Sequence, residues 1–487
     1  MARVASLTPS GGADLSSRTP LAIPEPTKLK GTAMLLPSTR SRRRASFTAV
    51  TGLSVACAAL VTACAPGAAS SSSPPSQPAS TAAGSAKATI TVEEASIDVP
   101  LFQKLGALFT AKYPNITVNV VGQDFNTLQT NVPRILTGSN VPDIIRLGAF
   151  GNTIADKQLT NLDPYAASYG WNGWPQAQFE STRSNAAGTE RGTGSLYGVG
   201  PGFGLTGIYY NKSLLTKIGA SVPATLSDLE ADMAKAKAAG VLPMVISGPA
   251  QTLSFAVQNL EVDYQNSVTA VQNWNYDKPG ASLNIPSFVK AATTLQAWAK
   301  DGYFPTDVNS VQEASAVSEF DAGTGLFYLS GNWDAPAIDK AGPGKFGFFG
   351  FPPAAAGGVT DAMSASDLQV IPSKAAHPAQ AAEFLNFIQT DQAARQASLD
   401  MGGYVPGGPA NAAQLTSPAG SAVSGTVSFF SDATTKNELT EFMVNATSSI
   451  SASTLVPDTE LLVGGKLSPA SFASTVQSDY ESQLASR

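Results

Sequence analysis

The sequence predicts an α/β fold in which an open sheet is built through parallel crossovers. From residue 88 onward, short runs rich in β-branched residues alternate several times with segments that repeat apolar residues at helical spacing. No internal repeat of solenoid length accompanies this alternation. Repeated strand–helix–strand units of this kind are typical of a parallel sheet covered by helices.

The first strands and helices are predicted between residues 89 and 147. The first helix has one apolar face, and Pro114 ends it. This face consists of Leu101, Leu105, Leu108 and Phe109. The stretches on either side are short and rich in Val, Ile and Thr, as strands are. We therefore expect strands at 89–92, 116–121 and 143–147 and helices at 99–113 and 124–136.

A second set of elements follows from residue 208. Residues 208–210 and 241–246 have the composition of strands, and the chain is then largely helical as far as residue 298. A helix begins near residue 225. There Ser227 opens a capping-box pattern, and Thr225 is the alternative cap.

In an open α/β sheet, ligands bind beyond the carboxyl ends of the strands. Here the predicted strand ends carry mostly polar side chains, together with Phe150. The polar ones are Glu93, Glu94, Gln123 and Asp124. For the last three, solvation at the surface explains the polar side chain as well as ligand binding does.

Composition narrows the function classes. The chain has 30 basic and 36 acidic residues, and removal of residues 1–63 takes away eight of the first and two of the second, which leaves a net charge of −12. This charge argues against nucleic acid and anionic membrane surfaces as partners. Both cysteines lie at or before residue 64, and His377 is the sole histidine. A Cys/His zinc site and Cys–His catalysis are therefore excluded, and we expect no metal or other cofactor.

Cys64 ends the run Val61-Thr62-Ala63-Cys64, after an uncharged apolar stretch at 47–61 and a block of arginines at 40–44. A basic region, a short apolar region and small residues before a cysteine resemble a bacterial lipoprotein signal. The apolar stretch is shorter than the ~20 residues that span a bilayer, so we expect it to be cleaved. The resemblance implies that Cys64 becomes a diacylated N-terminus. Cys57 fits less well, and a secretory signal with an incidental cysteine remains an alternative.

Residues 1–63 are accordingly assigned to a signal region. Met34 is its expected true start, because an ordinary signal begins there. Arg42-Arg43-Arg44 leaves a twin-arginine export signal open as an alternative. Residues 64–87 are rich in Ser, Pro, Ala and Gly and lack large apolar side chains. We expect them to form the lipidated cysteine and a disordered linker between lipid and domain.

Short motifs follow one another between about residues 89 and 406. They are YPNITV at 113–118, VPDII at 141–145, LYGV at 196–199, YYNK at 209–212 with 223–230, GNW at 331–333, and HP at 377–378 with AAEFL at 381–385. In this order they resemble family 1 of the extracellular solute-binding proteins, which deliver mostly sugars to ABC importers and include maltose-binding protein. Each motif alone is weak, and their common order carries the resemblance.

The resemblance implies a two-lobed α/β fold like that of type II periplasmic binding proteins, with a ligand cleft between lobes that chain crossovers join. Carried onto this sequence, the crossovers fall near residues 202–207 and 362–367. The first lobe would comprise residues 88–203 and 366–412, and the second lobe residues 207–362 and 413–487.

The resemblance also implies a ligand site. Trp333 stands where the family places a stacking aromatic, and a sugar needs such a flat apolar surface together with planar carboxylates and amides. The competing interpretation is a core tryptophan. The other expected ligand-binding residues are Phe203, Gly204, Phe150, Asn152, Asp124, Gln123, Glu94, Gln251, Ser366, Asp367 and Tyr404. A hinge or tight turn would explain the glycines around Gly204 equally well. Asp143 and Tyr210 are expected to be structural.

The function that the resemblance implies is that of a lipid-anchored receptor on the extracytoplasmic face of the cell membrane. It would capture a mono- or oligosaccharide without turning it over and deliver it to the permease subunits of an ABC transporter. We expect a monomer that has no cofactor and binds no nucleic acid. The apolar character of residues 147–150 and Phe203 leaves a smaller or less polar solute open.

Two other function classes remain open, a carbohydrate-active enzyme and a sensor without transport. A glycosidase needs two carboxylates in one cleft. The only conspicuous pair in the sequence is Glu93 and Glu94, and neighbours on a strand point to opposite faces. The sequence therefore favours a binding protein over an enzyme.

Overall fold

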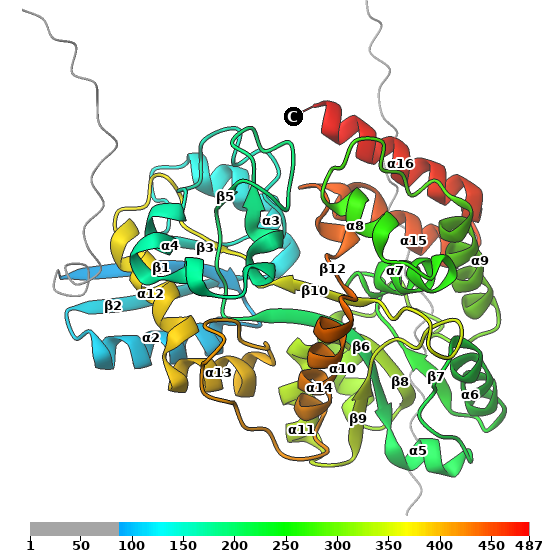
Figure 1. Cartoon of the computed structure of the whole chain (residues 1–487). Coiled ribbons are helices and arrows are strands. Elements are labelled where there is room, and N and C mark those ends of the chain that lie inside the picture. The colour runs from blue at the N-terminus through cyan, green and yellow to red at the C-terminus, as the bar shows by residue number, and fades with distance from the viewer. Residues whose placement is uncertain (1–86, 487) are drawn as a thin grey trace, which may run out of the picture. The chain divides into compact units, whose positions relative to one another are not determined.

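Two large sheets and a two-stranded sheet, with the helices packed on them, form the fold within residues 87–486, which are the residues that this computed structural model describes (Figure 1). The two-stranded sheet consists of β4 (Arg183–Ser184) and β5 (Ser195–Leu196). The predictions for Cys64, the signal region and nearly all of the linker lie outside the described residues. No helix within 87–486 is long and apolar enough to cross a membrane.

The first sheet has the strand order β11-β3-β1-β2. Its strands are β1 (Ala88–Ala95), β2 (Ile116–Gln123), β3 (Ile144–Arg146) and β11 (Gln369–Val370). β1 pairs in parallel with both β2 and β3, which confirms the parallel sheet predicted near the start of the domain. β11 comes from a distant part of the chain and pairs antiparallel with β3.

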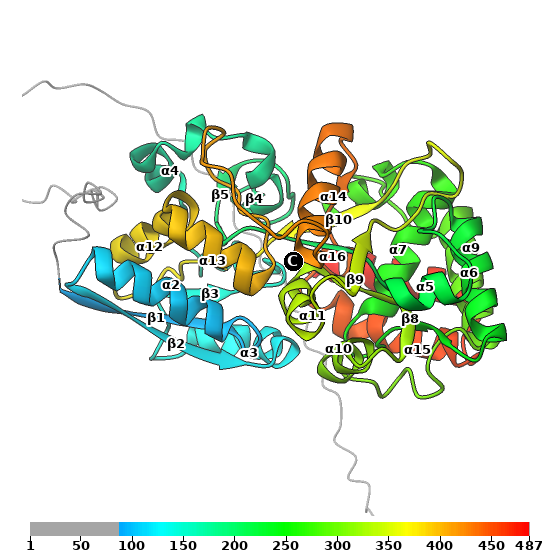
Figure 2. The same ribbon diagram turned by 90° about the horizontal axis from the view of Figure 1, so that it is seen from below.

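Helices cover both faces of the first sheet, as Figure 2 shows for α2, α12 and α13 on one side and α3 on the other. They are α2 (Val99–Lys112), α3 (Phe125–Thr137), α4 (Asp163–Tyr169), α12 (Pro378–Thr390) and α13 (Gln392–Gly402). Ile144 packs in the core with α2 and α12, whereas Ile145 packs with α3. Consecutive residues of a strand point to opposite faces, so a short apolar strand can serve both cores.

Asp124 and Asp143 hold the loops at the ends of these strands. Asp124 caps α3, because its carboxylate accepts the backbone N–H of Thr127 at 3.0 Å. Asp143 precedes β3, and its carboxylate accepts the backbone N–H groups of Thr91 at 3.0 Å and of His377 at 2.7 Å. Asp143 thus has the structural role expected of it, although it is not itself part of the strand.

The second sheet is mixed, with the order β12-β10-β6-β8-β7 and β9 paired to β6. Its strands are β6 (Phe203–Asn211), β7 (Leu242–Val245), β8 (Gly325–Gly331), β9 (Phe346–Phe349), β10 (Ala362–Ser366) and β12 (Leu439–Thr440). β6 is antiparallel to β8, β9 and β10, whereas β7 and β12 join in parallel. The parallel crossovers predicted for the first sheet therefore do not describe this one.

The helices around the second sheet are α5 (Lys212–Lys217), α6 (Leu226–Ala238), α7 (Thr252–Gln265), α8 (Thr269–Asn275), α9 (Pro286–Lys300), α10 (Glu313–Asp321), α11 (Ala335–Ala341), α14 (Ala422–Lys436), α15 (Val456–Val463) and α16 (Pro469–Ala485). They pack into a main core, which includes the C-terminal helices, and into a smaller core formed by α10, α11 and α14. The cap of α6 is Thr225, whose hydroxyl accepts the N–H of Asp228 in a capping box. Ser227 is not the cap, because it already lies in the first turn.

The chain passes between the two sheets three times. β6 and β10 run side by side (Figure 1). Their register places Phe203 opposite Ser366. Phe203 also bridges to Val405, where the chain leaves α13 for α14. We call the first sheet with its helices the first lobe, and the second sheet with its helices the second lobe. The exact lobe boundaries given above stay predictions.

Candidate functional site

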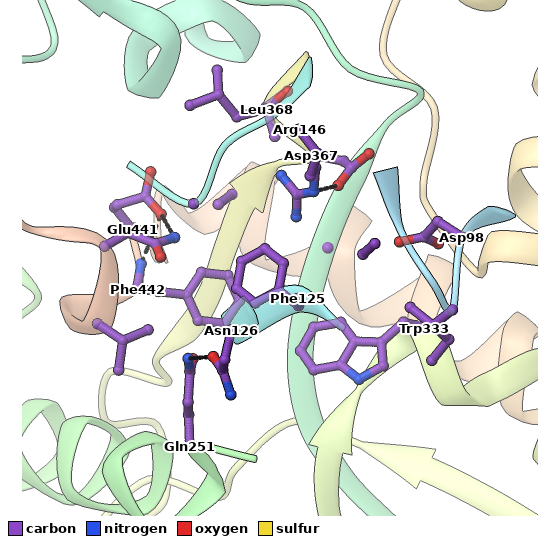
Figure 3. A pocket seen from close by; sticks show the side chains of 18 of the residues that line it. Asp98, Phe125, Asn126, Arg146, Gln251, Trp333, Asp367, Leu368, Glu441 and Phe442 are labelled. Atoms are coloured by element: carbon purple, nitrogen blue, oxygen red, sulfur yellow. Dashed lines mark hydrogen bonds and ion pairs between the residues drawn. The ribbon is translucent and has the colours of Figure 1, made fainter. Parts of the chain in front are cut away.

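A pocket lies between the two lobes, next to the carboxyl ends of the first-sheet strands (Figure 3). The first lobe lines it with residues at or after β1, β2 and β3, among them Asp98, Asp124, Phe125 and Arg146. The second lobe contributes residues such as Gln251, Phe255, Glu313, Trp333 and Phe442. The pocket has a volume of about 170 Å³, roughly ten times the space that one buried water needs. It can therefore hold an organic solute.

Trp333 forms an aromatic wall of this pocket. The ring is half-buried and packs near Phe255 and Phe442, with centroids 6.4 Å apart in each case. Gly331 makes room for it, because a Cβ atom at Gly331 would lie only 2.0 Å from the indole. A partly exposed indole over a pocket is suited to packing against an apolar face of a solute.

The residue between them, Asn332, ties the three chain crossings together. It is fully buried, and its side-chain oxygen accepts the N–H of Leu205 at 2.8 Å. Its side-chain nitrogen donates to the carbonyls of Phe203 at 3.0 Å and Gly403 at 2.8 Å. The Gly-Asn-Trp motif thus anchors the backbone by its asparagine while its tryptophan lines the pocket.

A buried group of charged side chains stands on the first-lobe side of the pocket. Glu94, Asp98 and Asp367 each place a carboxylate oxygen within 4.8 Å of the others. The Arg146 guanidinium forms an ion pair with Asp367 and lies 3.9 Å from Glu94. Gln369 donates from its amide to Glu94 at 2.6 Å and to Asp367 at 3.0 Å. Glu94 and Asp367 are therefore both held by Gln369, and Asp367 is also held by Arg146.

Asp98 and Asp367 line the pocket, and Asp98 is the one of these two that forms no ion pair within residues 87–486. One of its oxygens accepts the Tyr404 hydroxyl at 2.9 Å. Burial, and then the charge of Asp367, raises the pKa of Asp98 to about 7. Across the pocket, Glu313 accepts the indole N–H of Trp333 at 2.8 Å. Burial, and then the charge of Asp334, raises the pKa of Glu313 to about 8.

The lobes also touch beside the pocket through Arg191, which follows β4 (Arg183–Ser184) and precedes β5 (Ser195–Leu196). Its guanidinium lies 3.2 Å from the Glu441 carboxylate and donates to the carbonyl of Asn445 at 2.9 Å. Nearby, Lys278 and Glu190 form a more exposed pair at 2.9 Å. The segment between β4 and β5, which carries Glu190 and Arg191, is therefore joined to the second lobe at Lys278 and Glu441.

Seven of the residues predicted to bind ligand line this pocket. They are Trp333, Gly204, Asp124, Gln251, Ser366, Asp367 and Tyr404. Gly204 runs beneath the tryptophan, since a Cβ atom there would lie 3.6 Å from the ring. Gln251 donates to Asn126 of the first lobe at 3.3 Å, so it too bridges the lobes. That these seven residues contact a ligand stays a prediction.

Glu94 and Gln123 do not line the pocket. Glu94 is fully buried behind it and is bound by Gln369. Gln123 donates to Glu93 and accepts from Asn131, so its amide is used within the first lobe. Both residues lie at the predicted strand ends. The side chains that follow β1 and β2 and do line the pocket are those of Asp98, Asp124 and Phe125.

Phe203, Phe150 and Asn152 are also absent from the pocket wall. Phe203 stacks on Phe430 with centroids 5.4 Å apart. Phe150 is only 3% exposed and packs edge-on against Tyr197. Asn152 is exposed, in the turn that follows Phe150. Both phenylalanine rings pack against other aromatic rings of the protein, as phenylalanine side chains usually do.

Sequence reasoning missed several pocket residues. They include Asp98, Phe125, Arg146, Arg191, Glu313 and Glu441. Arg146 gave a usable signal, because a single arginine in the apolar run 144–147 needs a buried partner. Glu313 and Glu441 gave none, since they belong to segments whose place depends on the packing of the second lobe.

Comparisons with known proteins agree with this geometry. The sequence profile of the family described as bacterial extracellular solute-binding protein matches residues 93–395. The Multiple sugar-binding protein of Streptococcus mutans is 26% identical over 267 residues, which are 53% of this chain and 61% of that protein. The chain thus matches less than two thirds of the length of this relative.

Solved structures share the fold at low sequence identity. A chitin oligosaccharide binding protein superposes with a TM-score of 0.66 at 16% identity, covering 82% of this chain and 99% of its own. The solute-binding protein RafE in complex with raffinose superposes with a TM-score of 0.64 at 18% identity, covering 81% and 99%. At these identities the likeness concerns the two-lobed α/β fold.

Proposed function

Because the chain belongs to the bacterial extracellular solute-binding protein family, we propose that it captures a carbohydrate in its interlobe pocket and delivers it to the permease of an ABC importer. The observation that carries this proposal is the pocket itself, in which the half-buried indole of Trp333 stands among carboxylates and amides of both lobes. A sugar presents an apolar face and a rim of hydroxyl groups, and these are the groups that such a wall can bind.

The relatives support a carbohydrate over other solutes. The curated relative is named for multiple sugars, and the two superposed structures are named for chitin oligosaccharide and for raffinose. The pocket also lies next to the carboxyl ends of parallel strands, where open sheets bind ligands. Delivery to a permease and a monomeric state are part of the proposal.

A thermal-shift screen of the full-length protein against mono- and oligosaccharides tests the proposal. A saccharide that binds only the folded state raises the melting temperature, and at 100 times its dissociation constant it adds about 2.7 kcal/mol of stability. We expect at least one saccharide to do so in a concentration-dependent way. A panel in which no saccharide shifts the melting curve would contradict carbohydrate binding.

We propose further that the bound saccharide is not turned over. The relatives are named as binding proteins, and in the cluster around Asp98 the other two carboxylates are held by Arg146 and Gln369, so that this cluster by itself offers no free pair to flank a glycosidic bond. Incubation with the best-binding saccharide should return it intact by chromatography. Cleavage that Asp98→Asn abolishes would move the protein into the enzyme class.

The lipid anchor at Cys64 is the remaining part of the proposal. It follows from the arginine block, the apolar run and the Val-Thr-Ala-Cys sequence. Mass spectrometry of the native N-terminus should find a diacylglyceryl-modified Cys64 and no residue before it. An unmodified Cys64, or a mature chain that starts elsewhere, would refute the anchor without touching the solute-binding proposal.

A further inference from the structure

The charges that line the pocket do not balance. Five carboxylates line it, together with two guanidinium groups. The carboxylates are those of Asp98, Asp124, Glu313, Asp367 and Glu441. Arg146 is paired with Asp367, and Arg191 is paired with Glu441. Within residues 87–486, Asp98, Asp124 and Glu313 thus form no ion pair.

Asp98 and Glu313 also keep free hydrogen-bonding capacity. Asp98 is only 5% exposed, and its single side-chain hydrogen bond from the described residues comes from the Tyr404 hydroxyl. Glu313 is half-buried, and its single side-chain hydrogen bond comes from the Trp333 indole. Each carboxylate therefore has one oxygen that no donor within 87–486 reaches. Asp124 differs, because it is exposed and caps α3.

The groups around both carboxylates make an added cation favourable. Asp98 faces Asp367, Glu94 and the Tyr404 hydroxyl, with Arg146 as the one opposing charge. Glu313 faces the carboxylates of Asp334, Asp98 and Asp124 besides the indole of Trp333. Burial and this like charge raise the pKa of Asp98 to about 7 and that of Glu313 to about 8. A cation between them would favour the ionised forms.

We propose that the solute carries a protonated amino group, which binds between Asp98 of the first lobe and Glu313 of the second, so that the carbohydrate is an amino sugar. This inference rests on the proposed function. An ammonium group has three donors and no acceptor, which matches two carboxylate oxygens without partners. The indole of Trp333 lines the same pocket and adds a favourable surface for a cation.

A bare metal ion fits the same residues less well. Divalent cations such as Ca²⁺ take six to eight oxygen ligands. The oxygens nearest to Asp98 belong to Glu94 and Asp367, and these already bind Arg146 and the amide of Gln369. A cation at that place would have to displace the guanidinium. An amine between Asp98 and Glu313 leaves these contacts intact.

Calorimetric titration of the full-length protein with matched sugars tests the inference. The probes are glucose, glucosamine and N-acetylglucosamine, each as monomer and as β-1,4-linked dimer and trimer. The amine should bind roughly tenfold or more tighter than either neutral form of the same length. The neutral sugars can form only a neutral hydrogen bond where the ammonium group forms a charge-assisted one. Near neutral pH, binding of the amine should also release protons, since both carboxyl groups are partly protonated in the empty pocket. Titration in two buffers of different ionisation enthalpy measures this release.

Variants separate this inference from the general function. Asp98→Asn and Glu313→Gln should each remove most of the preference for the amine and reduce the proton release, while melting curves report whether the fold is kept. Glu319→Gln is the matched control, since Glu319 is exposed on the same helix as Glu313 and lies outside the pocket. It should leave the preference unchanged.

Neutral sugars that bind as tightly as the amines, with no proton release, would overturn this inference and leave the proposed function standing. A preference for the amine that survives both pocket substitutions would also overturn it, whereas failure of every sugar in these series and in the thermal-shift screen would overturn the proposed function.

Discussion

Replacing Trp333 with alanine is expected to weaken saccharide binding by about 1 to 3 kcal/mol, as removal of a buried aromatic anchor does at other binding surfaces. The indole is half-buried at the pocket wall and leans on Phe255 and Phe442, so alanine removes the flat surface against which a sugar ring would pack. Asn332, which ties the chain crossings, is unchanged in this variant. Isothermal titration alongside a melting curve measures both effects.

Trp333→Phe is the control for this substitution. It keeps an aromatic surface but loses the 2.8 Å hydrogen bond from the indole N–H to Glu313. We expect it to retain most of the affinity that alanine loses. If Trp333→Ala binds its saccharide normally but melts far lower than the native protein, the tryptophan belongs to the core and the site is misplaced.

Arg191→Met is expected to lower the free energy of unfolding by about 3 to 5 kcal/mol, the usual cost of leaving one partner of a buried ion pair behind. The side chains of Arg191 and Glu441 are only 5% and 3% exposed. Burial already raises the pKa of Glu441, and Arg191 opposes that rise. Without the guanidinium, Glu441 must either remain charged in the interior or take up a proton. Urea denaturation followed by circular dichroism measures the loss.

Two further variants test that interpretation. Adding Glu441→Gln to Arg191→Met should recover much of the lost stability, because it removes the uncompensated charge. Lys278→Met breaks the neighbouring pair with Glu190, whose side chains are 36% and 44% exposed, so we expect a loss of at most about 1 kcal/mol. Equal, small effects of Arg191→Met and Lys278→Met would show that the buried pair carries no special share of the stability.

Local structure and the general place of the site could be read from the sequence. The apolar spacing of α2, the alternation of strands and helices and the capping pattern at Thr225 depend on residues close together in the chain, and the structure contains all three. Ligands bind beyond the strand ends of an open sheet, and one wall of the pocket does lie at those strand ends. The motif order identified the family, and Gly331, two residues before Trp333, gives its ring the room that it occupies.

What only the tertiary structure decided is which distant side chains meet. Glu93 and Glu94 form the one carboxylate pair visible in the sequence, yet Glu94 joins Asp98 and Asp367, while Glu93 accepts from Gln123. A strand sends neighbouring side chains to opposite faces, so adjacency in sequence separates them in space.

The pairing of side chains in the pocket also depends on the tertiary structure. Arg191 meets Glu441, and Glu313 meets Trp333, through contacts between segments that no local pattern relates. The sequence determined which charges the domain carries. The packing of two lobes determined that two arginines would be neutralised and that Asp98 and Glu313 would form no ion pair within residues 87–486, because burial and pairing depend on distances that only the folded chain defines.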